Sequence, residues 1–266
     1  MSDGFSADWL RLREPYDTAA RDPDLLRQLA TWAERRDEIR VVDLGSGTGS
    51  NLRRTAPALG CRQDWTLIEW DRALIAAGER QLPPGPTTWR YRRLDLSVDL
   101  DRLGDEPCHL LTASALIDLV SAPWLEGLAS LRRRLGAALY VTLSYVGGVR
   151  WSPADPYDAT AMALVDAHQH TDKGFSPALG PEAAPALAAI LAREGRVSTG
   201  ASPWRLGPDD TELQRLLLEI YSGAALELTP AAGDELRGWV LRRHEFIAAG
   251  RSHLEVGHQD LLFLPN

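Results

Sequence analysis

The sequence has few cysteines and no long apolar run, and both absences exclude classes of protein. Its 2 cysteines, Cys61 and Cys108, are too few for a disulfide framework and lack the spacing of metal ligands, so we expect two buried thiols. The longest apolar stretch, 183–192, is broken by Pro185 and falls well short of the ~20 residues that cross a bilayer. Residues 1–4 contain an acid where a signal peptide carries basic residues. We therefore expect a cytoplasmic protein without a membrane partner.

Basic residues are outnumbered by acidic ones. The counts of 29 basic and 37 acidic residues give a net charge of -8, the opposite of what a binder of phosphate backbones carries, so no nucleic-acid partner is expected. Hydrophobic residues make up 44% of the chain and charged residues 25%, which excludes a disordered or low-complexity chain. A length of 266 residues suits one large α/β domain, which we assign to 1–266 as a whole.

Short apolar runs alternate with helical periodicity in the first 150 residues. We expect strands at 39–44, 65–68, 88–94, 110–113 and 138–144, and helices at 50–59, 72–81 and 124–135. Strands that alternate with helices predict a doubly wound parallel sheet. Two further helices, at 7–14 and 22–37, precede the first strand and form an N-terminal helical cap over 1–38.

The alternation changes after the fifth strand. Helices are expected at 158–167, 182–194, 210–225 and 231–249, and strands at 197–206 and 254–264. The helical insertions therefore occupy 151–195, after strand 5, and 208–250, between strands 6 and 7. We assign both insertions to the substrate side, because the edge that follows the carboxyl ends of the strands faces the ligand crevice of an open α/β sheet.

A glycine-rich turn joins the first strand to its helix. It places Gly45, Gly47 and Gly49 within five residues. Such a turn lets a ligand approach the backbone while helix N–H groups face it, although a tight turn without ligand is the alternative. The dinucleotide fingerprint asks for a sixth-position glycine, where this chain has Ser50, and that difference disfavours a nicotinamide cofactor.

Acidic residues follow the second and third strands. Glu69 lies 20 residues beyond Gly49, where an acid in such a sheet accepts hydrogen bonds from ribose hydroxyls. Asp71 is the alternative ribose acid, but we favour it as the N-cap of the helix that begins at Arg72. Asp95 ends the third strand and could accept from an adenine amino group, with a surface loop acid as the alternative.

Taken in order, Asp43-x-Gly45-x-Gly47-x-Gly49, Glu69, Asp95 and the segment 112–116 resemble the class I S-adenosylmethionine-dependent methyltransferases over roughly 38–145. The resemblance implies a Rossmann-like seven-stranded sheet with a reversed last strand, and S-adenosylmethionine as cofactor. It implies that Asp43 orders the glycine loop, that the first two glycines admit the methionine part, and that Glu69 holds the ribose and Asp95 the adenine. The expected cofactor-binding residues are Asp43, Gly45, Ser46, Gly47, Gly49, Glu69, Trp70, Asp95, Leu96 and Ser114.

The sequence also departs from that family in two places. His109 stands where many members carry an acid before the fourth strand, and a helical segment of about 40 residues separates the last two strands. Both departures leave the acceptor open.

The polar segment 167–181 holds the candidate catalytic residues. His168 and His170 are candidate bases with Asp172 as their orienter, and Lys173, the only lysine, is a candidate for holding an acceptor carboxylate or phosphate. The HxHxD spacing is used by metallo-hydrolases, but a lysine follows it and a helix precedes it, so no metal is expected. The segment is expected to cover the acceptor pocket, with a solvated loop and chance survival of the lysine as the alternatives.

Arginines and aromatic residues gather before the first strand. An arginine from 11–17, or Arg21, could pair with a cofactor or substrate carboxylate, and a salt-bridged surface helix is the alternative. Trp9, Tyr16 and Trp151 are candidates for a pocket wall or for core packing. The remaining histidines of the last helix and strand, His244, His253 and His258, are expected to be structural.

These features predict methyl transfer from S-adenosylmethionine to a small-molecule acceptor by in-line displacement. Such a transfer needs alignment more than it needs acid or base. A base is required only for a hydroxyl, an acidic carbon or a charged amine. The alternatives are an NAD-dependent oxidoreductase and a non-catalytic regulatory protein that binds the cofactor. Neither the methylated atom nor the oligomeric state is predicted.

Overall fold

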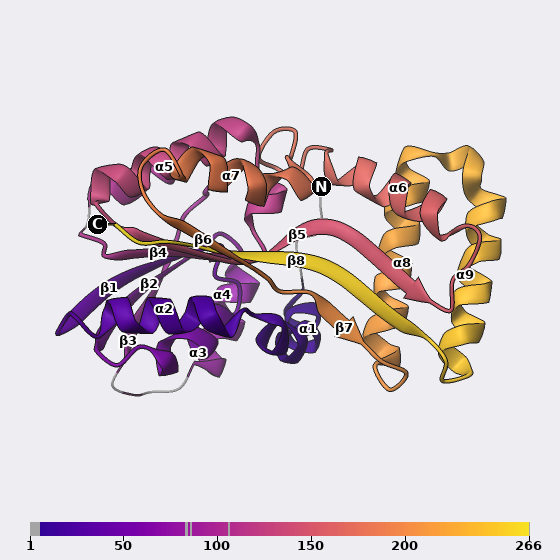
Figure 1. Cartoon of the computed structure of the whole chain (residues 1–266), viewed down its shortest axis with the longest axis horizontal. Coiled ribbons are helices and arrows are strands. Elements are labelled where there is room, and N and C mark those ends of the chain that lie inside the picture. The colour runs from indigo at the N-terminus through magenta and orange to yellow at the C-terminus, as the bar shows by residue number, and fades with distance from the viewer. Residues whose placement is uncertain (1–5, 83–84, 86, 106, 266) are drawn as a thin grey trace.

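The computed structural model describes residues 6–82, 85, 87–105 and 107–265, and a mixed sheet of 8 strands lies at its centre (Figure 1). The strands are β1 Glu38–Leu44, β2 Arg62–Glu69, β3 Thr88–Arg93, β4 Leu110–Ser114, β5 Ala138–Ser152, β6 Val197–Ala201, β7 Trp204–Leu206 and β8 His253–Phe263. Their spatial order is β3-β2-β1-β4-β5-β8-β6, and β7 also pairs with β8. β1 to β5 are mutually parallel, whereas β8 is antiparallel to its neighbours. The predicted doubly wound sheet with a reversed last strand is confirmed.

The sheet has one strand more than the seven expected. The expected strand 197–206 divides into β6 and β7 on either side of Ser202 and Pro203. Proline has no N–H to offer to a strand ladder, and the Ser202 N–H donates to the carbonyl of His258 at 2.9 Å between the two pieces. Both pieces pair with β8, so together they occupy the place of the sixth strand.

Helices cover both faces of the sheet. They are α1 Ala7–Ala20, α2 Pro23–Ala33, α3 Ser50–Thr55, α4 Arg72–Gln81, α5 Ala122–Leu135, α6 Asp158–Gln169, α7 Ala183–Leu191, α8 Thr211–Leu228 and α9 Gly233–Ala248. In Figure 1, α2 and α3 lie below the sheet and α5 and α7 above it. Each face therefore has its own apolar core.

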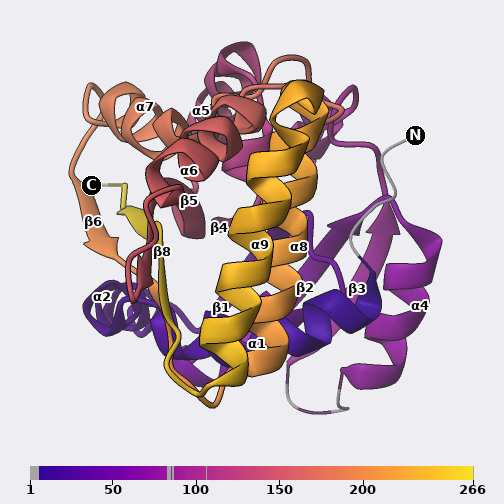
Figure 2. The ribbon, with the colours of Figure 1, turned by 90° about the vertical axis from the view of Figure 1, so that its right-hand side faces the viewer.

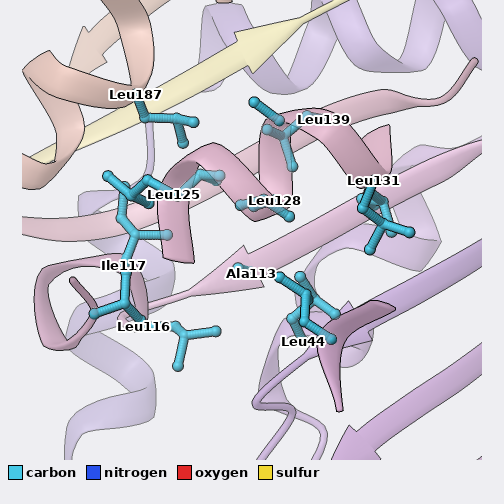
Figure 3. Close-up of a cluster of buried hydrophobic side chains, with 14 of the residues drawn as sticks. Leu44, Ala113, Leu116, Ile117, Leu125, Leu128, Leu131, Leu139 and Leu187 are labelled. Carbon is cyan, nitrogen blue, oxygen red and sulfur yellow. The ribbon is translucent and has the colours of Figure 1, made fainter. Parts of the chain in front are cut away.

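The core under α5 shows how the sequence spacing fixes the packing. Leu125, Leu128 and Leu131 recur every three residues, which places them on one face of the helix. All three are fully buried, and Figure 3 shows them against Leu139 of β5 and Leu187 of α7. Burying each such leucine contributes about 1.5–3 kcal/mol.

Local capping signals place several helix ends as expected. The side chain of Asp71 accepts from the N–H groups of Ala73 and Leu74, so its predicted role as the N-cap of α4 is confirmed. Gly136 ends α5 in the left-handed conformation at φ +64°, which glycine adopts without strain.

The first helix is longer than the sequence predicts. The expected helix 7–14 ends before Pro15, but α1 continues through the proline to Ala20. An interior proline destabilises a helix, and contacts elsewhere offset this cost. The hydroxyl of Tyr16 donates to Asp210 at 2.8 Å, and the side chains of Arg13 and Asp17 are ion-paired.

The fifth strand also runs further than predicted. It was expected to end at Ser144, but β5 continues to Ser152 because β8 pairs with it along the whole length. The expected insertion 151–195 therefore begins inside β5. A third apolar core lies where α6, α8 and α9 pack against the extended ends of β5 and β8, and Figure 2 looks onto α8 and α9 there.

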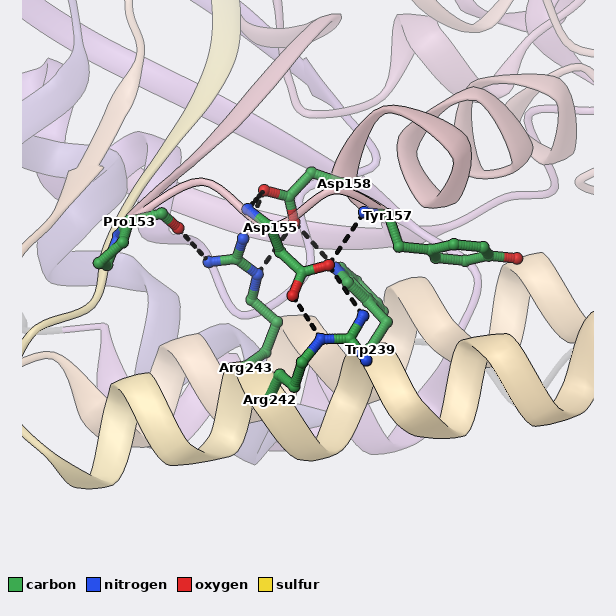
Figure 4. Close-up of polar contacts among 7 residues, drawn as sticks. All are labelled: Pro153, Asp155, Tyr157, Asp158, Trp239, Arg242 and Arg243. Carbon is green, nitrogen blue, oxygen red and sulfur yellow. Dashed lines mark hydrogen bonds and ion pairs between the residues drawn. The ribbon is translucent and has the colours of Figure 1, made fainter.

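An ion-pair network joins the start of α6 to α9 (Figure 4). The fully buried guanidinium of Arg243 pairs with Asp158 and donates to the carbonyl of Pro153 at 2.7 Å. The indole of Trp239 donates to the same Asp158 carboxylate at 2.8 Å. Arg242 pairs with Asp155 at 2.5 Å beside it. These bonds hold the C-terminal helices to the end of the long strand.

Within the described ranges, no helix combines the length and the apolar character that a bilayer-spanning segment needs.

Candidate cofactor-binding site

The glycine loop adopts a conformation that requires its glycines. Gly45, Gly47 and Gly49 have φ values of +63°, +53° and +80°, in the left-handed region where other residues are strained. A Cβ atom on Gly47 would lie 2.9 Å from Cδ1 of Leu10 in α1. The loop is held to β2 because the N–H of Ser46 donates to a β2 carbonyl at 2.9 Å.

Glu69 ties the glycine loop to the end of β2. One carboxylate oxygen accepts from the N–H of Gly47 at 2.8 Å, and the other accepts from Trp70 at 2.8 Å and Asp71 at 2.9 Å. An ionised carboxylate offers about four acceptor positions, so one remains for a ligand hydroxyl. The predicted ribose acid therefore lies directly beside the loop.

Asp43 lies beneath the loop, with 1% of its surface exposed. One of its oxygens accepts from the amide of Asn51 at 2.7 Å, and the other has no partner among the described residues. Burial raises the pKa of Asp43 to about 7, while the Asn51 bond and the charge of Arg21 act in the opposite direction.

Arg21 extends this buried network to β4. Its guanidinium donates to the side-chain oxygen Oδ1 of Asn51 at 2.7 Å, to the hydroxyl of Thr55 at 3.2 Å and to the hydroxyl of Ser114 at 3.2 Å. Ser114 is followed by Ala115, a non-glycine residue with φ +51°. The network therefore joins the N-terminal cap, α3 and the end of β4 around the glycine loop.

A cavity of about 90 Å³ lies between the loop and α1. Its lining consists of Leu10, Arg13, Asp17, Gly45, Ser46, Gly47, Ser50, Asn51, Glu69, Leu74, Ser114 and Ala115. Five of the predicted cofactor residues are brought together there, namely Gly45, Ser46, Gly47, Glu69 and Ser114. The cavity is smaller than the ~300 Å³ typical of ligand sites, and Leu10, Arg13 and Asp17 of α1 form its wall beside the loop.

A larger hollow of about 920 Å³ lies elsewhere, beside Leu59, Gln63 and Trp89. Its lining is mostly apolar and contains no acidic residue. This larger hollow contains none of the residues predicted to bind the cofactor, which gather instead around the glycine loop.

The expected adenine-side residues lie outside the small cavity. The carboxylate of Asp95 accepts from the N–H and the hydroxyl of Ser97 at 2.9 and 2.6 Å. Leu96 is buried, and its carbonyl accepts from the indole of Trp124 at 2.8 Å. Trp70 is 54% exposed beside Glu69. Contacts of Asp95, Leu96 and Trp70 with a cofactor stay predictions.

Two of the candidate catalytic residues lie together at the end of α6. The Nζ of Lys173 is 3.0 Å from Nδ1 of His168, whose Nε2 is 2.9 Å from a carboxylate oxygen of Glu227 in α8. Burial lowers the pKa of Lys173. The chain of contacts links the segment 167–181 to the C-terminal helices.

The other two candidates have separate partners. The ring of His170 lies 3.4 Å from Glu182, and Asp172 accepts from the N–H of Gly174 at 2.7 Å. Neither residue, nor His168 or Lys173, lines the cavity at the glycine loop. Their catalytic role stays a prediction. In the part of the chain that the structure describes, no three His, Cys, Asp or Glu side chains are grouped to hold a metal ion.

The aromatic candidates divide between the cap and the core. Trp151 is buried edge-on against Trp239 in the third core, so it packs there. Trp9 lies edge-on to Trp204, with 6.4 Å between the ring centres, beside the Arg13 guanidinium. His258 is buried against Trp204, and burial lowers its pKa to about 3, so the ring stays neutral.

Two buried polar residues near the site, Asn51 and Asp118, were not singled out from the sequence. Asn51 lies in the first turn of α3, directly after the glycine loop, and its side chain donates to Asp43. An amide side chain at this position was the sequence feature that could have indicated its role. Asp118, in a 3₁₀ turn after β4, is buried with one oxygen unpartnered among the described residues, and burial raises its pKa to about 6. The sequence predicted a candidate arginine within 11–17, and the structure shows that Arg13, ion-paired with Asp17, is the arginine of that range that lines the cavity.

Comparison with known proteins agrees with this architecture. No family model matches the sequence, and no curated protein sequence matches it. A putative methyltransferase from Bacillus halodurans has a TM-score of 0.51 at 12% identity, covering 89% of this chain and 96% of its own. It shows that the two chains share one fold, which is the fold that the resemblance of the motifs implied.

Two further solved structures match along most of their length. A SAM-dependent methyltransferase from Geobacter sulfurreducens, in complex with S-adenosyl-L-homocysteine, has a TM-score of 0.41 at 18% identity and covers 96% of this chain and 98% of its own. Mycolic acid cyclopropane synthase, complexed with SAH and CTAB, has a TM-score of 0.49 at 13% identity, with 96% and 94% covered.

Proposed function

We propose that this chain is an enzyme that transfers the methyl group of S-adenosylmethionine to a small-molecule acceptor. The observation that carries the proposal is the left-handed glycine loop bonded to the Glu69 carboxylate, within a methyltransferase fold. A dinucleotide-binding sheet has six strands in the order 3-2-1-4-5-6. Here the antiparallel β8 lies between β5 and β6, and Ser50 replaces the last fingerprint glycine, so the oxidoreductase alternative is not supported.

The chemical groups at the loop match those that S-adenosylmethionine requires. The glycines carry no side chain that would block the approach of a ligand to the loop, and Glu69 keeps one acceptor position for a ribose hydroxyl. Asp43 is buried beneath the loop and does not line the cavity, so we assign it the role of ordering the loop through its bond to Asn51. Asp95 and Leu96, at the end of the neighbouring β3, would hold the adenine.

The chemistry that S-adenosylmethionine supplies when bound is an electrophilic methyl group on a sulfonium sulfur. The work of the chain is then to align the acceptor and to exclude water. We assign the acceptor to the side that 151–181 covers. His168 or His170 would take a proton where the acceptor has one to lose, with Asp172 as orienter of the base, and Lys173 would hold a carboxylate or phosphate of the acceptor. A net charge of -8 favours a small molecule over nucleic acid.

We propose that the protein is located in the cytoplasm. Cys61 and Cys108 are both free thiols, which suits the reducing cytoplasm.

A ligand panel tests the proposal. Thermal unfolding is measured with S-adenosylmethionine, S-adenosylhomocysteine, NAD and NADP, because a ligand bound by the native state stabilises it by about 2.7 kcal/mol at a hundredfold excess over Kd. We expect both adenosyl compounds to raise Tm and the dinucleotides to leave it unchanged. Gly47→Val is the matched control, because φ +53° and the closeness of Leu10 exclude a side chain. Stabilisation by NAD without an adenosyl response would refute the proposal.

A further inference from the structure

A buried carboxylate with a free oxygen lies just beyond the glycine-loop cavity. Asp118 belongs to the 3₁₀ turn Ile117–Leu119, which follows β4 and the cavity residue Ala115. Only 9% of the Asp118 surface is exposed, and its Oδ1 atom has no hydrogen-bond partner among the described residues. A buried polar atom without a partner is costly, so this oxygen indicates a place for a donor from a ligand.

Tyr145 on β5 brings a second carboxylate to the same place. Its hydroxyl donates to Asp166 of α6 at 2.7 Å, and its backbone N–H donates a hydrogen bond to Asp118. Tyr221 of α8 is buried beside them, and burial and the charge of Asp166 raise the pKa of its hydroxyl. Two carboxylates therefore face one tyrosine, and Asp166 lies in the segment 151–181 that is assigned to the acceptor.

Among the described residues, no lysine or arginine pairs with either carboxylate. Burial raises the pKa of Asp118 to about 6, and the charge of Arg13 acts in the opposite direction. The Arg13 guanidinium, however, is already bonded to Asp17 at 2.9 and 3.1 Å. The ring of His258 lies 6.3 Å from that of Tyr145, measured between centres, and burial lowers its pKa to about 3, so it stays neutral. The negative charge of the two carboxylates is thus left uncompensated.

An aromatic wall and a second unpartnered atom complete the surroundings. His258 is 7% exposed, and its Nδ1 atom has no partner among the residues that the structure describes. Its ring lies 4.9 Å from that of Trp204, measured between centres. Aromatic faces attract organic cations. Negative charge, unpartnered polar atoms and aromatic faces together form surroundings that suit an ammonium group.

We propose that the acceptor is a small organic amine that binds as its ammonium ion, with the ammonium group held by the Asp118 carboxylate. This inference rests on the proposed function and names the class of its acceptor. An ammonium has up to three N–H donors, so it can use the free Oδ1 and compensate the buried negative charge. A neutral alcohol of the same shape supplies a donor but no charge, and an anionic group would be repelled from this place.

Transfer of a deuterated methyl group to the small molecules of a cell extract tests the class of the acceptor. The purified chain is incubated with S-adenosyl-[methyl-²H₃]methionine and this fraction, and products that carry the label are detected by mass spectrometry after ion-exchange chromatography at pH 7. We expect labelled products that a cation exchanger retains. Labelled products found only among neutral or anionic compounds would overturn the inference. A wild type that labels no small molecule would instead refute the proposed function itself.

Substitution of Asp118 tests the residue. Asp118→Asn keeps the shape of the side chain and removes its charge, Asp118→Ser is included in case the asparagine variant does not fold, and Asp101→Asn, at an 87% exposed side chain, is the matched control. The rate is measured as the concentration of extract is raised, and calorimetry gives Kd for S-adenosylhomocysteine.

We expect both Asp118 variants to need about ten- to a hundredfold more extract for half of the maximal rate, the range for a hydrogen bond to a charged group. Their Kd for S-adenosylhomocysteine should stay within twofold of the wild type, and Asp101→Asn should change neither quantity. An unchanged half-saturating concentration would overturn the inference. So would a tenfold loss of affinity for S-adenosylhomocysteine, since that result would place Asp118 at the cofactor.

Discussion

Replacing Glu69 by glutamine isolates the charge of the predicted ribose acid with little change of shape. The wild-type carboxylate accepts three backbone N–H groups, those of Gly47, Trp70 and Asp71. A glutamine has one oxygen, so it can keep the two bonds to Trp70 and Asp71 or the one bond to Gly47. In the first case its NH2 group opposes the Gly47 N–H and the loop loses its anchor.

The cost follows from these bonds. Losing one hydrogen bond to a charged acceptor costs about 1.5–3 kcal/mol, and loss of the charge weakens the two that remain. Because the Glu69 side chain is partly exposed, water replaces some of this loss, and we expect the unfolding free energy to fall by about 1–2 kcal/mol. The ribose hydroxyl loses its charged acceptor as well, so Kd for S-adenosylhomocysteine should rise about ten- to a hundredfold.

Calorimetric titration and urea unfolding measure the two effects on one preparation. Glu126→Gln, on the exposed side of α5, is the matched control and should change neither. A folded Glu69→Gln variant with wild-type affinity for S-adenosylhomocysteine would show that the ribose site has been misplaced.

Three further results are expected. Burial raises the pKa of Asp43 to about 7, so the protonated carboxyl stabilises the folded state below pH 4 and this contribution is lost as the pH rises through 7. Between pH 4 and 8, the unfolding free energy of the wild type, measured in urea, should fall by on the order of 4 kcal/mol more than that of Asp43→Asn. Parallel curves of unfolding free energy against pH would contradict this. Arg243→Met leaves Asp158 without its buried partner and should cost about 3–5 kcal/mol, against less than 1 kcal/mol for the exposed Arg237→Met; equal small losses in urea would refute the network. His168→Ala should leave Kd for S-adenosylhomocysteine within twofold, because the ring lines no part of the loop cavity, and a tenfold change in calorimetry would place it at the cofactor.

The parts of the fold that follow from local sequence were predictable. The glycine turn, the Asp71 cap and the Gly136 helix end each depend on residues within a few positions. The full length of β5 could not be predicted, because its second half forms a strand only by pairing with β8, about 110 residues later in the chain. Gly147 and Gly148 within it resemble a strand end when read alone.

The residues of the candidate site also fall into two groups, those predictable from local sequence and those that depend on distant partners. Glu69 was predictable because a fixed spacing from the glycines places it at the end of the adjacent strand. Arg13 was one of several charged residues on an amphipathic helix, and only folding shows which of them turns inward. Asn51 and Arg21 likewise gain their importance from partners that are distant in sequence.

Transfer of an isotopically labelled methyl group tests the central claim most directly. The purified chain is incubated with S-adenosyl-[methyl-¹⁴C]methionine and a cell extract that has been separated into small molecules, protein and nucleic acid, and Gly47→Val serves as the inactive control. The account predicts label in the small-molecule fraction and an equal amount of S-adenosylhomocysteine. Label in protein or nucleic acid would contradict the acceptor class. No transfer to any fraction by a chain that binds S-adenosylhomocysteine would favour a regulatory protein and contradict the enzyme.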